Sequence, residues 1–217
     1  MIIDIFNLLP DINVNINNPY IKALLNKNYG NKCKYFNILK DYKLLLDNDI
    51  DVSIEKFLIL NKEVIFIPIE FTDLTIYAFQ LRSLTQKKFY NVIIDDRFPL
   101  CYGFYDFYDY KLGDPIILVE GIKDLYAIKY YYKYALAYMT SQLNSKLYDF
   151  LRYNVTSKLY MILDNDKAGR RLLWNEKYEG FNKFLLISKD SGEYFDKMDK
   201  NILLQIEGIV NGFVKEI

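Results

Sequence analysis

The sequence predicts an α/β protein in which a parallel sheet flanked by helices occupies residues 113–217 and a smaller mixed α+β subdomain precedes it in residues 1–112. Three observations support this prediction. After Pro115, apolar runs of strand length alternate regularly with helical patterns, which indicates repeated βα units and hence a parallel sheet. Before Leu60 only short helical patterns occur. Between these regions lie extended segments rich in Ile, Phe and Tyr.

The N-terminal subdomain is predicted to be helical over residues 1–60 and to form strands over residues 61–94. Thr72 and Asp73 break the pattern between the first two strands and suggest a hairpin. Because Pro68 has no backbone N–H, we expect its strand to be bulged or to lie at an edge. The expected helices are Pro19–Leu25, Tyr35–Leu46 and Ser53–Leu60, and the expected strands are Glu63–Glu70, Leu74–Leu81 and Lys88–Ile94.

The C-terminal unit is expected to begin near Gly113 and to end in a helical segment that runs to Ile217. Thr140 or Ser141 is suited to cap its second helix. Repeated βα units place helices on both faces of the sheet. The expected strands are Pro115–Val119, Ala135–Tyr138, Lys158–Leu163 and Phe184–Ile187, and the other helices are expected at Lys123–Tyr134 and Ala168–Tyr178.

Composition excludes several kinds of site. The chain has no histidine and only two cysteines, Cys33 and Cys101, so it cannot assemble a four-ligand zinc site or use imidazole as a general base. Its 28 basic and 28 acidic residues cancel, so any surface for nucleic acid must be local. Two isolated thiols, and the lack of a signal-peptide pattern or membrane-length apolar run, favour a cytoplasmic protein. Abundant Tyr, Asn, Ile and Lys are typical of an A/T-rich genome such as that of a bacteriophage.

Four carboxylates follow the predicted strands of the parallel sheet, and they are Glu120, Asp164, Asp166 and Asp190. The carboxyl ends of parallel strands lie at one edge, where loops carry ligand-binding side chains. Acids that converge there repel one another unless a cation lies between them, and hard oxygen ligands favour Mg²⁺ or Mn²⁺ over zinc. The sequence therefore predicts a divalent-metal site for phosphate chemistry.

The first acidic motif is LVEGIKD, residues 118–124. Gly121 allows a sharp turn directly after the strand, so that Glu120 projects into the crevice and Asp124 lies near the start of the next helix. The structural alternative is that Glu120 is a solvated strand end and Asp124 merely favours the helix dipole. Taken alone, the motif favours this alternative.

The second motif is ILDNDKAGRR, residues 162–171. Asp164 and Asp166 can face one ion across a tight loop, while Ala168 and Gly169 permit close packing where the next helix starts. The alternative is that these acids cap the helix. A third acidic segment, KDSGE at residues 189–193, has the composition of a turn and supplies Asp190 and Glu193 as a further ligand and an outer one.

Basic residues follow the second motif at once. Lys167, Arg170 and Arg171 lie within five residues of one another and beside two acids, which suits phosphate binding. The alternative for either arginine is a solvated helix face.

These motifs, in this order, resemble the Toprim domain shared by DnaG-type primases, topoisomerases and several nucleases. Glu120-Gly121, Asp164-Asn165-Asp166 and Asp190 match the family's acidic positions, and DNDKAGR is similar to the primase branch in particular. The resemblance implies Glu120, Asp164 and Asp166 as catalytic metal ligands. It also implies two or three Mg²⁺ or Mn²⁺ ions, with Asp124 and Asp190 completing the metal site.

The passage before the parallel sheet is similar to the one that precedes Toprim in DnaG-type primases, where an Arg, a Lys and an Asn bind template and nucleotides. The matching residues are Arg82, Lys88 and Asn91. Phe79, Phe89 and Tyr90 are interleaved with them and are available for base stacking, although core packing is the expected role of Phe79. Lys167 and Arg170 would join this nucleotide- and template-binding set.

The sequence also departs from the primase pattern. The zinc-binding module that reads the template is missing, and no long helicase-binding extension follows the Toprim half. Gln80 and Leu81 replace family glycines, and Met139 stands where a glycine precedes Thr140. These changes concern how the template is gripped and whether a partner is needed.

The expected function is a DNA primase, a DNA-directed RNA polymerase that joins ribonucleoside triphosphates into short primers on single-stranded DNA during DNA replication. A replicative helicase or a separate template-recognition protein is an expected partner, and a membrane is not. The alternatives are a Toprim nuclease, such as a ribosomal RNA maturase or an OLD-type enzyme, and a non-catalytic module that binds the replisome. The chain is too short for the strand-passage gate of a topoisomerase.

Overall fold

The structure is a computed structural model, and it describes residues 2–12, 33–72, 75–86, 88–140, 142–154, 158–186 and 200–214. The chain forms two compact units, residues 1–69 with 76–96 and residues 70–75 with 97–217. The boundary near Gly113 stays a prediction. The predicted helix Pro19–Leu25 and the acids Asp190 and Glu193 lie outside the described residues. No helix in the described ranges is both long and apolar enough to cross a membrane.

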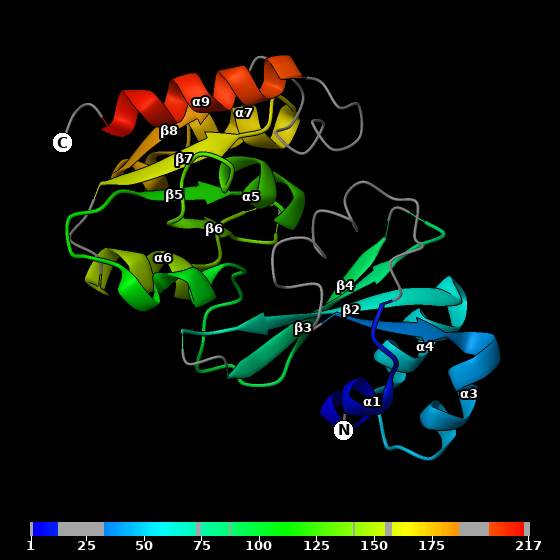
Figure 1. The fold of residues 1–217 in the computed structure, drawn as a ribbon. Coiled ribbons are helices and arrows are strands. Elements are labelled where there is room, and N and C mark those ends of the chain that lie inside the picture. Colours follow the sequence, from blue (N-terminus) through cyan, green and yellow to red (C-terminus); the bar gives the residue numbers. More distant parts are fainter. Residues whose placement is uncertain are drawn as a thin grey trace. The chain divides into compact units, whose positions relative to one another are not determined.

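The N-terminal unit contains a four-stranded sheet in the order β1-β2-β3-β4, and β1 with β2 and β3 with β4 pair antiparallel (Figure 1). Side-chain caps fix its helices, since Asn37 accepts a hydrogen bond from the Leu39 N–H and Asp51 accepts one from the Ser53 N–H. Its elements are α1 (Ile2–Leu8), β1 (Lys34–Asn37), α3 (Ile38–Leu46), α4 (Val52–Asn61), β2 (Glu63–Glu70), β3 (Ile76–Ser83) and β4 (Phe89–Ile93).

Aromatic rings fill the core of this unit. Phe79 packs against Phe6 with ring centroids 4.8 Å apart and against Phe66 at 6.3 Å. Pro68 lies on β2, which is an internal strand, so an edge position for the whole strand is wrong. The ladder between β1 and β2 reaches only to Phe66, however, so Pro68 lies beyond the segment of β2 that pairs with β1.

The C-terminal unit contains the predicted parallel sheet. Its strand order is β6-β5-β7-β8, and all three ladders are parallel (Figure 1). The strands are β5 (Ile116–Val119), β6 (Ala135–Ala137), β7 (Leu159–Leu163) and β8 (Phe181–Leu185), and the helices are α5 (Ile122–Ile128), α6 (Ser145–Asn154), α7 (Lys167–Leu173) and α9 (Lys200–Val214). Two 3₁₀ helices, η2 (Phe104–Asp109) and η3 (Glu176–Tyr178), complete the unit.

Helices cover both faces of this sheet. Leu147 and Leu151 of α6 and Leu172 of α7 share one apolar cluster with alternate strand residues such as Leu118 and Met161. On the other face, α5 lies in contact with α9. This arrangement is the α/β fold that the sequence predicts.

Several element bounds differ from the prediction. Lys34–Asn37, at the start of a predicted helix, is a strand that pairs with β2. Asn144, and not Thr140, caps α6, since its Oδ1 accepts the Leu147 N–H at 2.8 Å, and Ser141 lies outside the described residues. Other differences include the ends of α5 at Ile128 and of α7 at Leu173, the start of β8 at Phe181, and the bounds of β3, Ile76–Ser83.

Candidate active site

Two of the predicted metal ligands lie at the same edge of the parallel sheet. Glu120 directly follows β5 and Asp164 directly follows β7. These strands are neighbours and parallel, with Leu118 opposite Met161, so their carboxyl ends meet at one edge. Both carboxylate side chains are half-buried.

Tyr138 lies within the electrostatic reach of three of the predicted acids. Tyr138 lies directly after β6, which is the other neighbour of β5 in the sheet, and it is 1% exposed. Burial raises the pKa of its hydroxyl, and the negative charges of Glu120, Asp164 and Asp124 raise it further. Two carboxylates at strand ends and one from α5 therefore act on one buried hydroxyl. The sequence pattern places Tyr138 at the end of a predicted strand and gives no signal for its position near the acids.

Two of the predicted ligands also act as helix caps. The Gly121 N–H donates to Asp124 Oδ2 at 3.0 Å, and the Asp124 side chain is 7% exposed. The Gly169 N–H donates to Asp166 Oδ1 at 2.8 Å. The capping interpretation thus holds for both aspartates, and it leaves a metal role open because each of these bonds uses a single carboxylate oxygen.

The loop between Asp164 and α7 is held in a tight conformation. A Cβ atom on Gly169 would lie 1.9 Å from the backbone oxygen of Asp164, so only glycine fits at this position. The Arg170 guanidinium donates from Nε and from a terminal nitrogen to Asn165 Oδ1, at 3.0 and 2.8 Å. Both contacts fix the acidic loop against the helix that follows it.

Met139 occupies a backbone conformation that favours glycine. Its φ is +58°, and its N–H donates to the Glu120 backbone oxygen at 2.8 Å. A left-handed φ costs a residue with a Cβ about 1 kcal/mol or more. This cost falls where the sequence departs from the glycine of the primase pattern, directly beside Glu120.

The acids do not form a ready-made three-ligand site. Within the described part of the chain, no group of three Cys, Asp or Glu side chains is close enough to hold a metal ion. Cys33 and Cys101 form no disulfide and are buried. The donor set at the edge consists of carboxylate oxygens, which suit Mg²⁺ or Mn²⁺, and the fourth predicted acid, Asp190, lies outside the described residues.

In the N-terminal unit, Arg82 and Asn91 lie on one face of the β3–β4 hairpin. Asn91 is opposite Gln80, whose Nε2 donates to Asn91 Oδ1 at 3.2 Å, and Arg82 is two residues further along the same face. Lys88 is exposed, and its backbone oxygen accepts the Ser83 N–H that closes the hairpin. The structure therefore places these three predicted residues on one hairpin.

The aromatic residues of this hairpin divide between its two faces. Phe79 is fully buried, as expected. Tyr90 packs its ring 5.8 Å from that of Phe57 and donates to Ser53 Oγ, so it belongs to the contact with α4. Phe89 is opposite Arg82 and 53% exposed, which leaves it suited to stack on a base.

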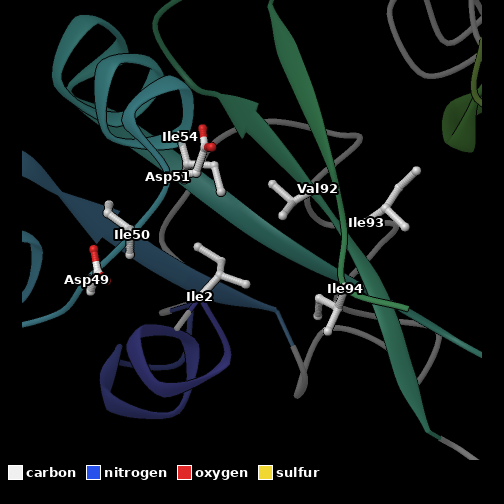
Figure 2. A pocket seen from close by; sticks show the side chains of 8 residues that line it. All are labelled: Ile2, Asp49, Ile50, Asp51, Ile54, Val92, Ile93 and Ile94. Atoms are coloured by element: carbon white, nitrogen blue, oxygen red, sulfur yellow. The ribbon is translucent and has the colours of Figure 1, made fainter. Parts of the chain in front are cut away.

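A cavity of about 230 Å³ lies elsewhere in the N-terminal unit. Figure 2 shows side chains from α1, α4 and β4, among them Ile2, Ile54 and Val92, around this space. Asp49 and Asp51 are the charged residues of its lining, and Asp51 is engaged as the cap of α4. The cavity is mainly apolar and contains none of the predicted site residues.

Solved structures share this fold. A DnaG primase catalytic domain bound to ssDNA aligns over 98% of this chain and 79% of its own, with a TM-score of 0.59 and 15% identity. The chain has the fold of a DnaG-type primase catalytic core. The Aquifex aeolicus primase, with its zinc-binding and RNA polymerase domains, aligns over 96% of this chain and 59% of its own, with a TM-score of 0.62 and 17% identity.

A phage protein has a related architecture. The primase fragment of the bacteriophage T7 primase-helicase protein aligns over 66% of this chain and 62% of its own, with a TM-score of 0.50 and 15% identity. No protein-family model and no curated protein matches the sequence. The DnaG-type fold is therefore recognised from structure, at an identity that carries no residue roles with it.

Proposed function

We propose that this chain is a primase that synthesises short RNA primers on single-stranded DNA from ribonucleoside triphosphates. The observation that carries the proposal is that Glu120 and Asp164 follow adjacent parallel strands at one edge of the sheet, within a DnaG-type fold. Because the chain contains no histidine, imidazole catalysis is unavailable and the carboxylates are the candidate catalytic groups at this edge. Metal-dependent nucleotidyl transfer needs only oxygen ligands and positioned phosphates.

The residues of the edge divide the work of this reaction. Glu120, Asp164 and Asp166 would hold Mg²⁺ or Mn²⁺, with Asp124 and Asp190 as ligands of a second or third ion. Bound there, the ions would orient the attacking 3′ hydroxyl and neutralise the triphosphate.

Basic and polar side chains would position the substrates. Lys167 and Arg170 lie at the start of α7, beside the acidic loop, and would hold the triphosphate. Arg82, Lys88 and Asn91, together on the β3–β4 hairpin, would bind the template strand. This chain has no histidine and only two cysteines, which is too few for a zinc module that recognises the template sequence. A replicative helicase or a separate template-recognition protein would supply that recognition.

The proposal is tested by incubating the protein with single-stranded DNA, labelled ribonucleotides and Mg²⁺ or Mn²⁺. We expect template-dependent di- and oligonucleotides, and a loss of at least about 100-fold in Asp164→Asn, because that change removes a carboxylate that would hold the metal ion. Asp149→Asn, at an exposed acid of α6, is the matched control and should retain synthesis. Shortening of a labelled strand without synthesis would identify a nuclease instead, and undiminished synthesis by Asp164→Asn would refute the assignment.

A further inference from the structure

Trp174 is the only tryptophan of the chain, and its side chain is 82% exposed. It lies directly after the last residue of α7. Among the described residues, no ring contact or hydrogen bond involves its indole. Such a large aromatic side chain is costly to leave in water and is enriched where it meets a ligand. The core of the unit does not account for Trp174.

The exposed side of α7 leads from the acidic loop to this indole. Lys167, Arg170 and Arg171 are exposed, whereas Gly169 and Leu172 are buried against the sheet. Residues three or four apart on a helix are neighbours, so the backbone positions of both arginines lie one turn before Trp174, while the Arg170 guanidinium is directed to Asn165 at the acidic loop. The helix contains no acidic residue, and within the described ranges no carboxylate forms an ion pair with these three cations. Arg170 donates to the neutral Asn165 amide oxygen and so keeps its charge.

A second group of cations and rings in the same unit differs in this respect. Lys129 lies 4.3 Å from the centroid of the Tyr105 ring, and Lys133 lies 4.2 Å from that of Tyr108. Each of these lysines forms an ion pair with an aspartate of η2. That group is neutralised within the protein, whereas the cations of α7 form no ion pair within the described residues and lie on the same helix as a ring without ring contacts.

We propose that the α7 face formed by Lys167, Arg170, Arg171 and Trp174 binds single-stranded nucleic acid, with a base stacked on the indole. Stacking on an aromatic ring together with cations along the backbone is how single strands are bound without sequence preference. Because α7 starts at the acidic loop, the strand would extend from the candidate active site along the helix. This inference rests on the proposed function only for the identity of the strand as template or primer.

The single tryptophan makes a direct test possible. Wild-type protein is titrated with an unstructured oligo-dT strand in EDTA, without nucleotides, while indole fluorescence and the anisotropy of labelled DNA are followed. We expect fluorescence to be quenched in step with binding, because Trp174 is the only indole. Binding seen by anisotropy without any change in fluorescence would overturn the proposal, and so would the absence of binding.

Substitutions measure how much the face contributes. Trp174→Ala should weaken binding about 5- to 150-fold, the range expected for one stacked base, while Trp174→Phe should retain most of the affinity. Arg171→Gln should lower the slope of log affinity against log salt by about 0.7, as for one phosphate contact on a single strand. Tyr130→Ala, at a 53% exposed ring after α5, is the matched control and should bind as wild type.

Equal affinity of Trp174→Ala and the wild type for the oligo-dT strand would contradict the inference. Equal losses of affinity in Trp174→Ala and Tyr130→Ala would also contradict it. Primer synthesis, measured separately with Mg²⁺, keeps the two proposals apart. Synthesis with no quenching contradicts only the α7 face, whereas quenching with no synthesis contradicts only the polymerase activity.

Discussion

At the scale of single residues, the candidate site depends on close backbone contacts around two acidic strand ends. Gly169 allows its helix to approach the Asp164 carbonyl, and the Met139 N–H holds the Glu120 carbonyl. Motif reading anticipated the close packing at Gly169. It could not anticipate Tyr138, because the charges that raise the pKa of this hydroxyl come from two other segments of the chain.

Replacing Gly169 by alanine should damage the acidic loop. The added Cβ would meet the Asp164 backbone oxygen at 1.9 Å, so we expect a loss of about 1–3 kcal/mol in the free energy of unfolding, the usual cost of overpacking. Denaturant unfolding measures this loss. Gly208→Ala in α9 is the control, since its Cβ meets nothing within 4 Å and alanine should stabilise the helix by about 0.5–1 kcal/mol. Equal effects of the two changes would contradict the described loop.

The two roles assigned to Asp166 can be separated. Asparagine also caps helices, so Asp166→Asn should keep the free energy of unfolding close to that of the wild type while losing metal-dependent synthesis. Asp166→Ala should lose the activity and, in addition, about 1 kcal/mol of stability. Comparing unfolding and activity in both variants tests the assignment, and full activity in Asp166→Asn would leave the residue only its capping role.

At the scale of elements, the strands of the parallel sheet were easier to predict than the helix ends. Apolar runs identified β5 and β7 to within one residue, because both strands are buried on both faces. The end of α5 was placed too late. Tyr132 donates its hydroxyl to the Pro115 carbonyl at 2.6 Å, and this long-range bond fixes a turn that the local pattern does not reveal. Lys34–Asn37 likewise became a strand only through pairing with β2.

The contact between η2 and the end of α5 should depend on one buried ion pair. The side chains of Lys129 and Asp106 are only 5% and 18% exposed. Asp106→Ala would leave the ammonium group buried without its partner, so we expect a loss of about 3–5 kcal/mol in the free energy of unfolding. Asp109→Ala removes the corresponding pair with Lys133, which is exposed, and should cost far less. Similar losses in both variants would show that burial does not distinguish the pairs.

At the scale of the whole molecule, the two units are described separately, and each contains part of the predicted machinery. Glu120, Asp164 and Asp166 belong to the C-terminal unit, and Arg82, Lys88 and Asn91 belong to the N-terminal unit. The order of the acidic motifs was sufficient to predict the parallel sheet and the primase-like fold. Whether the acids form a complete metal site could not be predicted to the same degree. The answer depends on where the side chains lie and on the position of Asp190.

The free energy of unfolding should decrease as pH rises above about 10. Burial raises the pKa of Tyr132 and of Tyr178, whose hydroxyls donate to backbone carbonyls. The unfolded chain releases these protons near pH 10 while the folded chain keeps them, so this contribution is complete below about pH 10 and is lost as pH rises further. With no histidine, no imidazole step should appear between about pH 5 and 8. Denaturant unfolding measured from about pH 5 to above pH 10 checks both points. Tyr132→Phe should reduce the loss of stability at alkaline pH. An unchanged loss in this variant would contradict the role of Tyr132.

We propose that carboxylates from two adjacent strand ends share a divalent ion. Binding of Mn²⁺, followed by the electron paramagnetic resonance signal of free Mn²⁺, tests this sharing. Glu120→Gln and Asp164→Asn should each weaken binding at least about tenfold, and the double variant should lose less than the two losses combined, because both side chains serve one site. Asp149→Asn should bind as wild type. Wild-type affinity in both single variants, or losses that simply add, would contradict a shared site.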